Sequence, residues 1–210
     1  MFDWKLLNFR RCAAIAIALA AANLAFGQSP STATTQSAAP AVSLSPESPE
    51  QLRDVESAMK RLDPLLGDWQ ASGFVRGPAG PNRQMSSHWH VERAFGGRYL
   101  RLEFVMRNES RRIAFVGYFT YDPADKTYRT LWVSPDTLYQ FSERGSLDET
   151  GTKLTLVSHQ QNAGGKEAVV TSIFRFDRPD KFTVEDRTET ENAEPFVSFH
   201  FDAVREKPRQ

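Results

Sequence analysis

The chain has 210 residues, with 26 basic and 26 acidic side chains and a formal net charge of zero. It therefore lacks the excess of basic charge that drives binding to nucleic acid or to anionic lipid, and we expect no nucleic-acid partner. The single cysteine, Cys12, lies near the N-terminus, so the rest of the chain contains no disulfide. We expect one domain held together by its hydrophobic core.

Residues 1–27 have the pattern of a secretory signal peptide. Lys5, Arg10 and Arg11 precede an uncharged apolar run over residues 12–26, and small residues follow. The run is shorter than the roughly 20 residues that a membrane-spanning helix needs. We expect cleavage at the end of this segment, which predicts a periplasmic or secreted protein without a membrane span. Retention of the segment as a membrane anchor is the alternative.

The next two segments predict a linker and a helix. Residues 28–47 are almost entirely Ser, Thr, Ala, Pro and Gln, a composition typical of a disordered linker. The Ser-Pro-Glu-Gln sequence at 48–51 favours a helix start, with a Ser cap, an early proline and a capping box. Apolar residues at three- and four-residue intervals predict a helix over 48–63, ended by an Asp-Pro pair.

From residue 64 to 207 the hydrophobic period changes to two, which indicates strands with one buried face. Turn residues separate the segments, and no connection is long enough for a parallel crossover. We therefore predict one antiparallel β-domain over 64–207, with about ten sequential strands. These are 68–76, 84–93, 98–107, 111–121, 127–134, 137–146, 152–160, 167–177, 181–188 and 195–206.

Ten sequential strands in one open sheet would leave two exposed edges, and closure removes both. We therefore predict an all-β fold that consists of an antiparallel up-and-down barrel preceded by one short helix. A sandwich of two five-stranded sheets is the alternative, because strand periodicity alone does not separate the two architectures.

The predicted first strand resembles the opening of a known barrel family. Gly67, Asp68 and Trp69 match the Gly-x-Trp motif of lipocalin-like, or calycin, barrels. In these families the tryptophan plugs the closed end, and an arginine of the last strand packs across its ring, where a guanidinium is attracted to an indole. The resemblance implies barrel-closing roles for Gly67, Trp69 and Arg205.

A longer resemblance covers most of residues 60–206. It rests on Leu-Leu-Gly-Asp-Trp at 65–69, Gly-Gly-Arg-Tyr-Leu at 96–100 and Gly-Ser-Leu-Asp at 145–148. These segments are similar to those of a bacterial family of secreted proteins that is classed as a domain of unknown function near the lipocalin-like folds. The resemblance supports the barrel and implies no catalytic residues.

A remote resemblance to nitrobindin-type haem barrels rests on the Leu-Gly-x-Trp opening at 66–69. Those proteins bind haem iron through a histidine of the last strand, which would correspond to His200. Strand alternation, however, puts Phe199 on the same face as Arg205, and Ser198 and His200 on the opposite, solvent face. We therefore expect no cofactor, with haem as the alternative.

Two further histidines, His88 and His90, flank Trp89 on one strand, at a spacing that two metal ligands can use. Trp89 is the more natural inward residue, and no third ligand lies nearby in the sequence. We therefore expect both histidines to face solvent and predict no metal site, with His88, His90 and His200 as weak candidates.

The common enzyme motifs are missing from the sequence, among them Gly-x-Ser-x-Gly and the phosphate-binding loop. Glu103, or Glu185 with Asp186, could act in acid–base chemistry only if carboxylates met across a cleft. We therefore predict no catalysis. An enzyme that uses an interior carboxylate or histidine for isomerisation or hydrolysis is the alternative.

Aromatic residues come from several predicted strands, and such rings either fill a small barrel or line an apolar cavity within it. The predicted function is binding of a small hydrophobic or amphipathic molecule, because barrels of this size leave room for one ligand. An envelope interaction domain with a packed core is a further alternative. The residues expected to line the cavity are Trp89, Tyr118, Trp132, Phe141, Phe174 and Phe199.

Overall fold

The structure is a computed structural model that describes residues 48–109, 111–135, 140–161, 167–191 and 193–207. The signal peptide and the linker predicted for residues 1–47 lie outside this part of the chain. Within it, no helix has the length and apolar character needed to cross a membrane.

The first element is helix α1, Pro49–Lys60, and its start has the predicted capping box. The Ser48 hydroxyl accepts a hydrogen bond from the Gln51 amide, and the Gln51 side chain accepts one from the Ser48 amide. This confirms the predicted short helix, although α1 ends three residues earlier than expected. A short 3-10 turn, η2 (Asp63–Leu65), then leads into the first strand.

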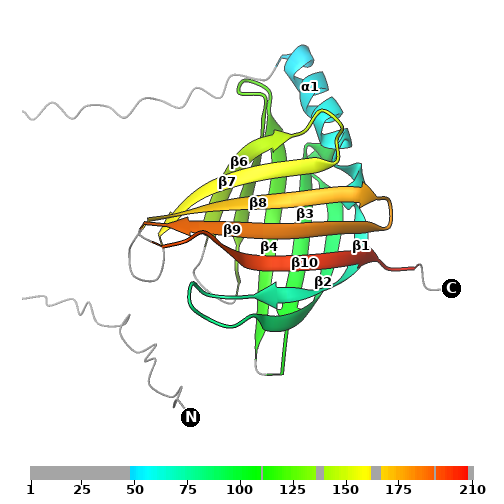
Figure 1. Ribbon diagram of the computed structural model, residues 1–210. Helices are drawn as coiled ribbons and strands as arrows, with labels where there is room; N and C mark the ends of the chain where they lie inside the picture. Colours follow the sequence, from blue (N-terminus) through cyan, green and yellow to red (C-terminus); the bar gives the residue numbers. More distant parts are fainter. Residues whose placement is uncertain (1–47, 110, 136–139, 162–166, 192, 208–210) are drawn as a thin grey trace, which may run out of the picture. The chain divides into compact units, whose positions relative to one another are not determined.

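Ten antiparallel strands form a closed barrel in which each strand pairs with the next, and β1 pairs with β10 (Figure 1). The predicted up-and-down barrel is confirmed, and the alternative of two packed sheets is wrong. The strands are β1 Gly67–Val75, β2 Arg83–Ala94, β3 Tyr99–Arg107, β4 Arg112–Asp122, β5 Thr127–Val133, β6 Gln140–Leu147, β7 Lys153–Gln161, β8 Glu167–Arg178, β9 Lys181–Thr190 and β10 Phe196–Arg205. A second 3-10 turn, η3 (Phe95–Gly97), joins β2 to β3.

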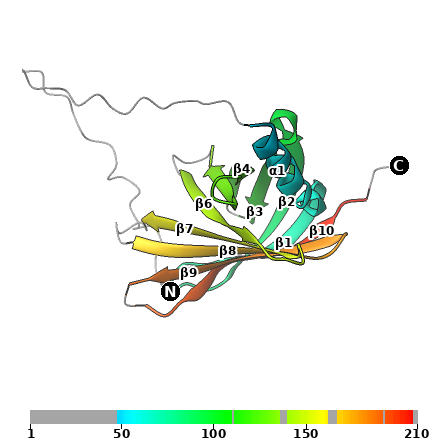
Figure 2. The same ribbon diagram turned by 90° about the horizontal axis from the view of Figure 1, so that it is seen from above.

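Alternate residues of each strand point into the barrel, as strand geometry requires. In β2, for example, Met85, Trp89 and Val91 are buried. The view from above shows β3, β4 and β6 across the interior from β8 and β9 (Figure 2). Side chains from strands that are distant in sequence therefore meet inside the barrel.

One end of the barrel is closed by α1, η2 and Trp69. The Trp69 indole nitrogen donates to the Leu65 carbonyl at 2.9 Å, and the Trp69 ring meets Phe182 edge to face at 4.7 Å. The buried Tyr128 hydroxyl of β5 donates to the Ala58 carbonyl at 2.9 Å, which ties the helix to the barrel. This end is packed with side chains and leaves the opposite half for a cavity.

Arg205 and Gly67 complete this closed end. The guanidinium carbon of Arg205 lies 4.1 Å from the centroid of the Trp69 ring. The guanidinium also donates to the carbonyl oxygens of Pro64 at 2.9 Å and Pro179 at 3.0 Å. Gly67 has a φ of +114°, and a Cβ there would lie 2.7 Å from the Arg205 guanidinium. The glycine of the Gly-x-Trp motif is thus required by backbone conformation and by the approach of the arginine.

The register of β10 against β9 shifts between Val197 and Phe199. This β-bulge inserts Ser198 as an extra residue, so the residues before it and after it do not share one alternation of inward and outward sides. Ser198, which simple alternation places on the solvent face, therefore lines the barrel interior together with Phe199. The sequence-based assignment of Ser198 is wrong because strand alternation does not anticipate a bulge.

Candidate functional site

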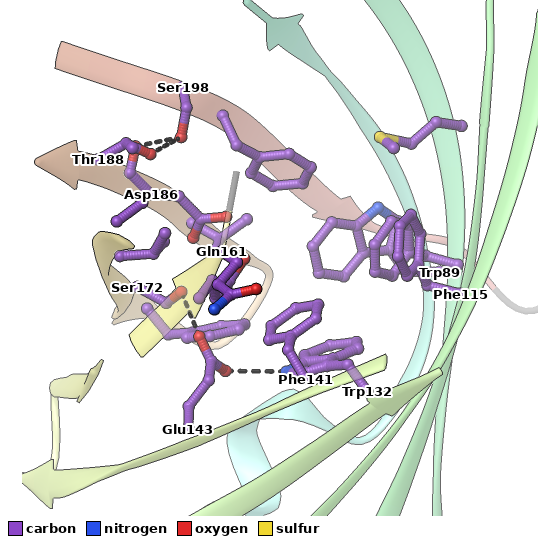
Figure 3. A pocket seen from close by; sticks show the side chains of 18 residues that line it. Trp89, Phe115, Trp132, Phe141, Glu143, Gln161, Ser172, Asp186, Thr188 and Ser198 are labelled. Carbon is purple, nitrogen blue, oxygen red and sulfur yellow. Dashed lines mark hydrogen bonds between the residues drawn. The ribbon is translucent and has the colours of Figure 1, made fainter. Parts of the chain in front are cut away.

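A cavity of about 380 Å³ occupies the half of the barrel remote from α1. Its volume lies within the range of about 300–1,000 Å³ that is usual for small-molecule sites. Side chains from β2 through β10 contribute to its wall, and Figure 3 shows them from close by. The apolar lining residues are Trp89, Phe104, Met106, Phe115, Trp132, Phe141, Ala168, Val170, Phe174, Val184 and Phe199, and the polar ones are Glu143, Gln160, Gln161, Ser172, Asp186, Thr188 and Ser198.

The aromatic rings of β2 to β6 form one side of this cavity. Trp89 stacks on Phe104 with ring centroids 4.8 Å apart, and Phe104 stacks on Phe115 at 5.1 Å. Trp132 and Phe141 lie nearly parallel to each other at 6.1 Å. Because each ring is held by another ring, this side presents a largely preformed apolar surface.

A glycine in β4 makes room for one of these rings. Gly117 lies opposite Trp132 in the pairing of β4 with β5. A Cβ at position 117 would lie 2.5 Å from the Trp132 ring, which is far closer than van der Waals contact allows. The absent side chain at Gly117 therefore sets the position of Trp132 in the cavity wall.

The rest of the cavity wall is polar and centres on Glu143 of β6, which lies beside Trp132 and is only 4% exposed. One oxygen of its carboxylate accepts hydrogen bonds from the Thr130 hydroxyl and the Trp132 indole nitrogen, both at 2.8 Å. The other oxygen accepts one from the Ser172 hydroxyl at 2.6 Å. Three neutral donors thus fix the orientation of a buried acidic group, as a buried carboxylate requires.

A second carboxyl group, that of Asp186, faces the same space. Asp186 of β9 lies directly opposite Ser172 of β8, so the serine stands beside both acidic groups (Figure 3). Burial raises the pKa of the Asp186 carboxyl from 3.8 to about 7, and the nearby charge of Glu143 adds to this rise. Hydrogen bonding with Ser172 opposes it. Near neutral pH the cavity therefore holds one carboxyl group that gains or loses a proton easily.

Three further polar groups complete the wall. The Thr188 hydroxyl donates to the Ser198 hydroxyl at 2.7 Å, next to Asp186 (Figure 3). The Trp89 indole nitrogen is buried without a hydrogen-bond partner in the part of the chain that the structure describes. An unpaired buried donor is costly, which makes Trp89 an exception among the buried polar groups of this wall.

Five of the six aromatic residues predicted to line a cavity do lie in its wall. These are Trp89, Trp132, Phe141, Phe174 and Phe199. Tyr118 instead faces outward, where its ring lies 6.1 Å from that of the exposed Phe95. The reason is the phase of β4: Gly117 and Phe119 point inward, so Tyr118 between them cannot.

Sequence reasoning missed Glu143, Ser172 and the inward position of Asp186. Glu143 lies in a Ser-Glu-Arg sequence that is polar on both strand faces, so no alternation marks it as interior. Asp186 was considered with Glu185, but only Asp186 lines the cavity. The inward position of Phe104, which also lines the cavity, could have been predicted, because Leu100, Leu102 and Phe104 alternate with polar residues.

The three histidines considered as ligands lie outside the cavity wall. His90 is 2.6 Å from Asp68 and His88 is 3.1 Å from Glu206, each measured from the ring nitrogen Nδ1 to a carboxylate oxygen. His200 stacks on Phe74 and lies 3.6 Å from Glu185. The described residues contain no group of three or more potential ligands that could hold a metal ion.

A haem barrel of the nitrobindin type needs a histidine inside the barrel. The described residues that line this cavity include no histidine, and the nitrogen atoms of His200 lie near Glu185 and Asp202. The residues present therefore do not fit a histidine-ligated haem in this cavity.

Comparisons with solved structures show the same fold in two other proteins. Rv2717c from M. tuberculosis has a TM-score of 0.58 at 16% identity, with 73% of this chain and 99% of that chain covered. The S-type phycobiliprotein lyase CPES from Guillardia theta has a TM-score of 0.52 at 12% identity, with 76% and 98% covered. These similarities show a lipocalin-like barrel and carry no residue roles.

No curated protein matches the sequence significantly. A family model described as a protein of unknown function matches residues 55–205, which include the second half of α1 and the whole barrel. This agrees with the predicted resemblance to a domain of unknown function near the lipocalin-like folds. The chain belongs to the DUF1579 family of proteins of unknown function.

Proposed function

We propose that the barrel binds a small hydrophobic or amphipathic molecule in its interior cavity. The observation that carries the proposal is the cavity of about 380 Å³ with its wall of stacked aromatic rings. A ligand that covers this wall removes apolar surface from water and gains about 25 cal/mol per Å². The similarity in fold to a phycobiliprotein lyase is consistent with small-molecule binding.

The ligand is best identified by extracting the protein as purified from its native source and analysing the extract by mass spectrometry. Binding can then be measured by titration, because Trp89 and Trp132 lie in the cavity wall and report on it through their fluorescence. We expect a lipid, pigment or similar molecule to be recovered in near-equal molar amount. Repeated recovery of protein without any such molecule, together with no fluorescence response to apolar probes, would contradict the proposal.

A pair of variants on β8 separates cavity binding from surface effects. Val170 lines the cavity, whereas its neighbour Val169 does not. Val170→Phe should fill part of the cavity and abolish binding, while Val169→Phe should bind as the unaltered protein does. Cooperative thermal unfolding of both variants would show that each one is folded.

We also propose that binding takes place in the periplasm or outside the cell, because residues 1–27 have the pattern of a signal peptide. Fractionation of cells that produce the full chain tests this. A protein that stays in the cytoplasm with its N-terminus intact would contradict it.

Acid–base catalysis is a second candidate function, and the pairing of Asp186 with Glu143 favours it. A carboxyl group with a pKa of about 7 suits proton transfer near neutral pH, and a second carboxylate lies in the same cavity. Isomerisation or hydrolysis of the bound molecule would be the reaction class. Incubation of the identified ligand with the unaltered protein and with Asp186→Asn decides between the two: a product formed only by the former supports catalysis, and unchanged ligand supports binding alone.

A further inference from the structure

We propose that the polar end of the ligand is a cation, such as an ammonium group, which binds between the carboxyl groups of Glu143 and Asp186. This inference rests on the proposed ligand-binding function and names the chemical class of the ligand.

The charges in the cavity wall support a cation. Glu143 and Asp186 are its acidic residues, and the described lining residues include no lysine, arginine or histidine. The three donors to Glu143, from Thr130, Trp132 and Ser172, are neutral groups. They orient the carboxylate and leave its charge unbalanced. In a partly desolvated site, the attraction between a cation and this carboxylate is stronger than it would be in water.

The same charges disfavour the other common head groups. A fatty carboxylate would bring a third acidic group next to Glu143 and Asp186, and like charges at this range repel. A neutral hydroxyl head could form hydrogen bonds with the two carboxyl groups, but it would not balance their charge. The site therefore discriminates by the sign of the head group as well as by its size.

The aromatic residues beside the carboxylates suit the same ligand. Trp132 donates its indole N–H to Glu143 while its ring faces that of Phe141, so aromatic rings lie next to the acidic group. The faces of such rings attract cations, and they do so most effectively where water is excluded. The stacked rings of Trp89 and Phe104 extend this wall and offer an apolar surface to the rest of the molecule.

Three probes that share one alkyl chain test the proposal: decyltrimethylammonium, decanol and decanoate. The quaternary ammonium keeps its charge at every pH, so only the protein titrates. Binding is followed by tryptophan fluorescence and by calorimetry, below the micelle concentration of the two charged probes and below the solubility limit of decanol. We expect the ammonium to bind at least about tenfold more tightly than decanol, and decanoate to bind most weakly.

Single substitutions test which carboxyl groups bind the ammonium head group. Asp186→Asn and Glu143→Gln should each weaken binding of decyltrimethylammonium by about tenfold or more. The matched control is Glu189→Gln, which removes an acidic charge from an exposed residue of the same strand, outside the cavity wall. It should leave the affinity unchanged. If Glu143→Gln does not fold, because its amide replaces an oxygen that accepts hydrogen bonds, Asp186→Asn alone decides.

The outcomes separate this inference from the proposed function. Decanol or decanoate binding as tightly as the ammonium would overturn the cation assignment and leave small-molecule binding intact. The same holds if Asp186→Asn binds the ammonium as well as the unaltered protein does. Absence of binding for all three probes would instead overturn the ligand-binding function.

Discussion

The raised pKa of Asp186 makes the stability of the protein depend on pH in a way that one substitution removes. The carboxyl group has a pKa of about 7 in the folded protein, against 3.8 as its ordinary value. Between these two values the unfolded chain has released a proton that the folded chain still holds. Because the unfolded state then binds fewer protons, the free energy of unfolding falls as pH rises through this window.

The size of the effect follows from the shift of about three pKa units. Each unit is worth about 1.4 kcal/mol, so Asp186 lowers the free energy of unfolding by at most about 4 kcal/mol between about pH 4 and about pH 8. This is an upper limit, because Asp186 keeps part of its surface exposed. Asp186→Asn cannot ionise and should show none of this loss.

Urea unfolding of both proteins, free of ligand, over this pH range measures the difference. The free energy of unfolding of Asp186→Asn, relative to that of the unaltered protein, should increase as pH rises, by up to about 4 kcal/mol. The raised pKa of His90, caused mainly by its hydrogen bond to Asp68, also costs stability as pH rises, but it acts equally in both proteins. Glu189→Gln, at an exposed position of the same strand, is the matched control, and its free energy of unfolding should change with pH as that of the unaltered protein does. A difference between Asp186→Asn and the unaltered protein that stays constant with pH would refute the reasoning.

Three further predictions concern packing in the barrel. Trp69→Ala removes the buried ring at the closed end and should lower the free energy of unfolding, measured by urea titration, by about 3–5 kcal/mol. A loss below about 1 kcal/mol would show that the stability of this end does not depend on the indole. Gly117→Ala should displace the ring of Trp132, with a cost of about 1–3 kcal/mol and an altered tryptophan emission, whereas an unchanged spectrum would contradict the crowding seen here. Gly73→Ala should lower the melting temperature far more than Gly77→Ala does. The reason is that a Cβ at position 73 would overlap the backbone of β10, whereas a Cβ at position 77 meets nothing within 4 Å. Equal melting temperatures would contradict the close approach of β1 and β10.

The sequence by itself determined the helix and the succession of strands. The capping sequence at 48–51 and the apolar alternation after residue 64 are local signals, and the structure has the helix start and the strands where these signals predict them. The absence of long connections forced neighbouring strands to pair antiparallel, and ten such strands favoured closure. The Gly67 and Trp69 motif is also recognisable locally, although the crowding that requires a glycine at 67 comes in part from Arg205 of β10.

Only the tertiary structure decided which polar residues meet in the cavity. Glu143, Ser172 and Asp186 stand on β6, β8 and β9, and it is the barrel that brings their side chains together (Figure 3). The bulge in β10, which turns Ser198 inward, likewise depends on pairing with β9 and has no local signal. A polar residue in a strand reads as solvent-facing from sequence alone, because its burial depends on partners that are distant along the chain. The hydrogen bonds and charges of this polar wall are therefore properties of the closed barrel and not of any single strand.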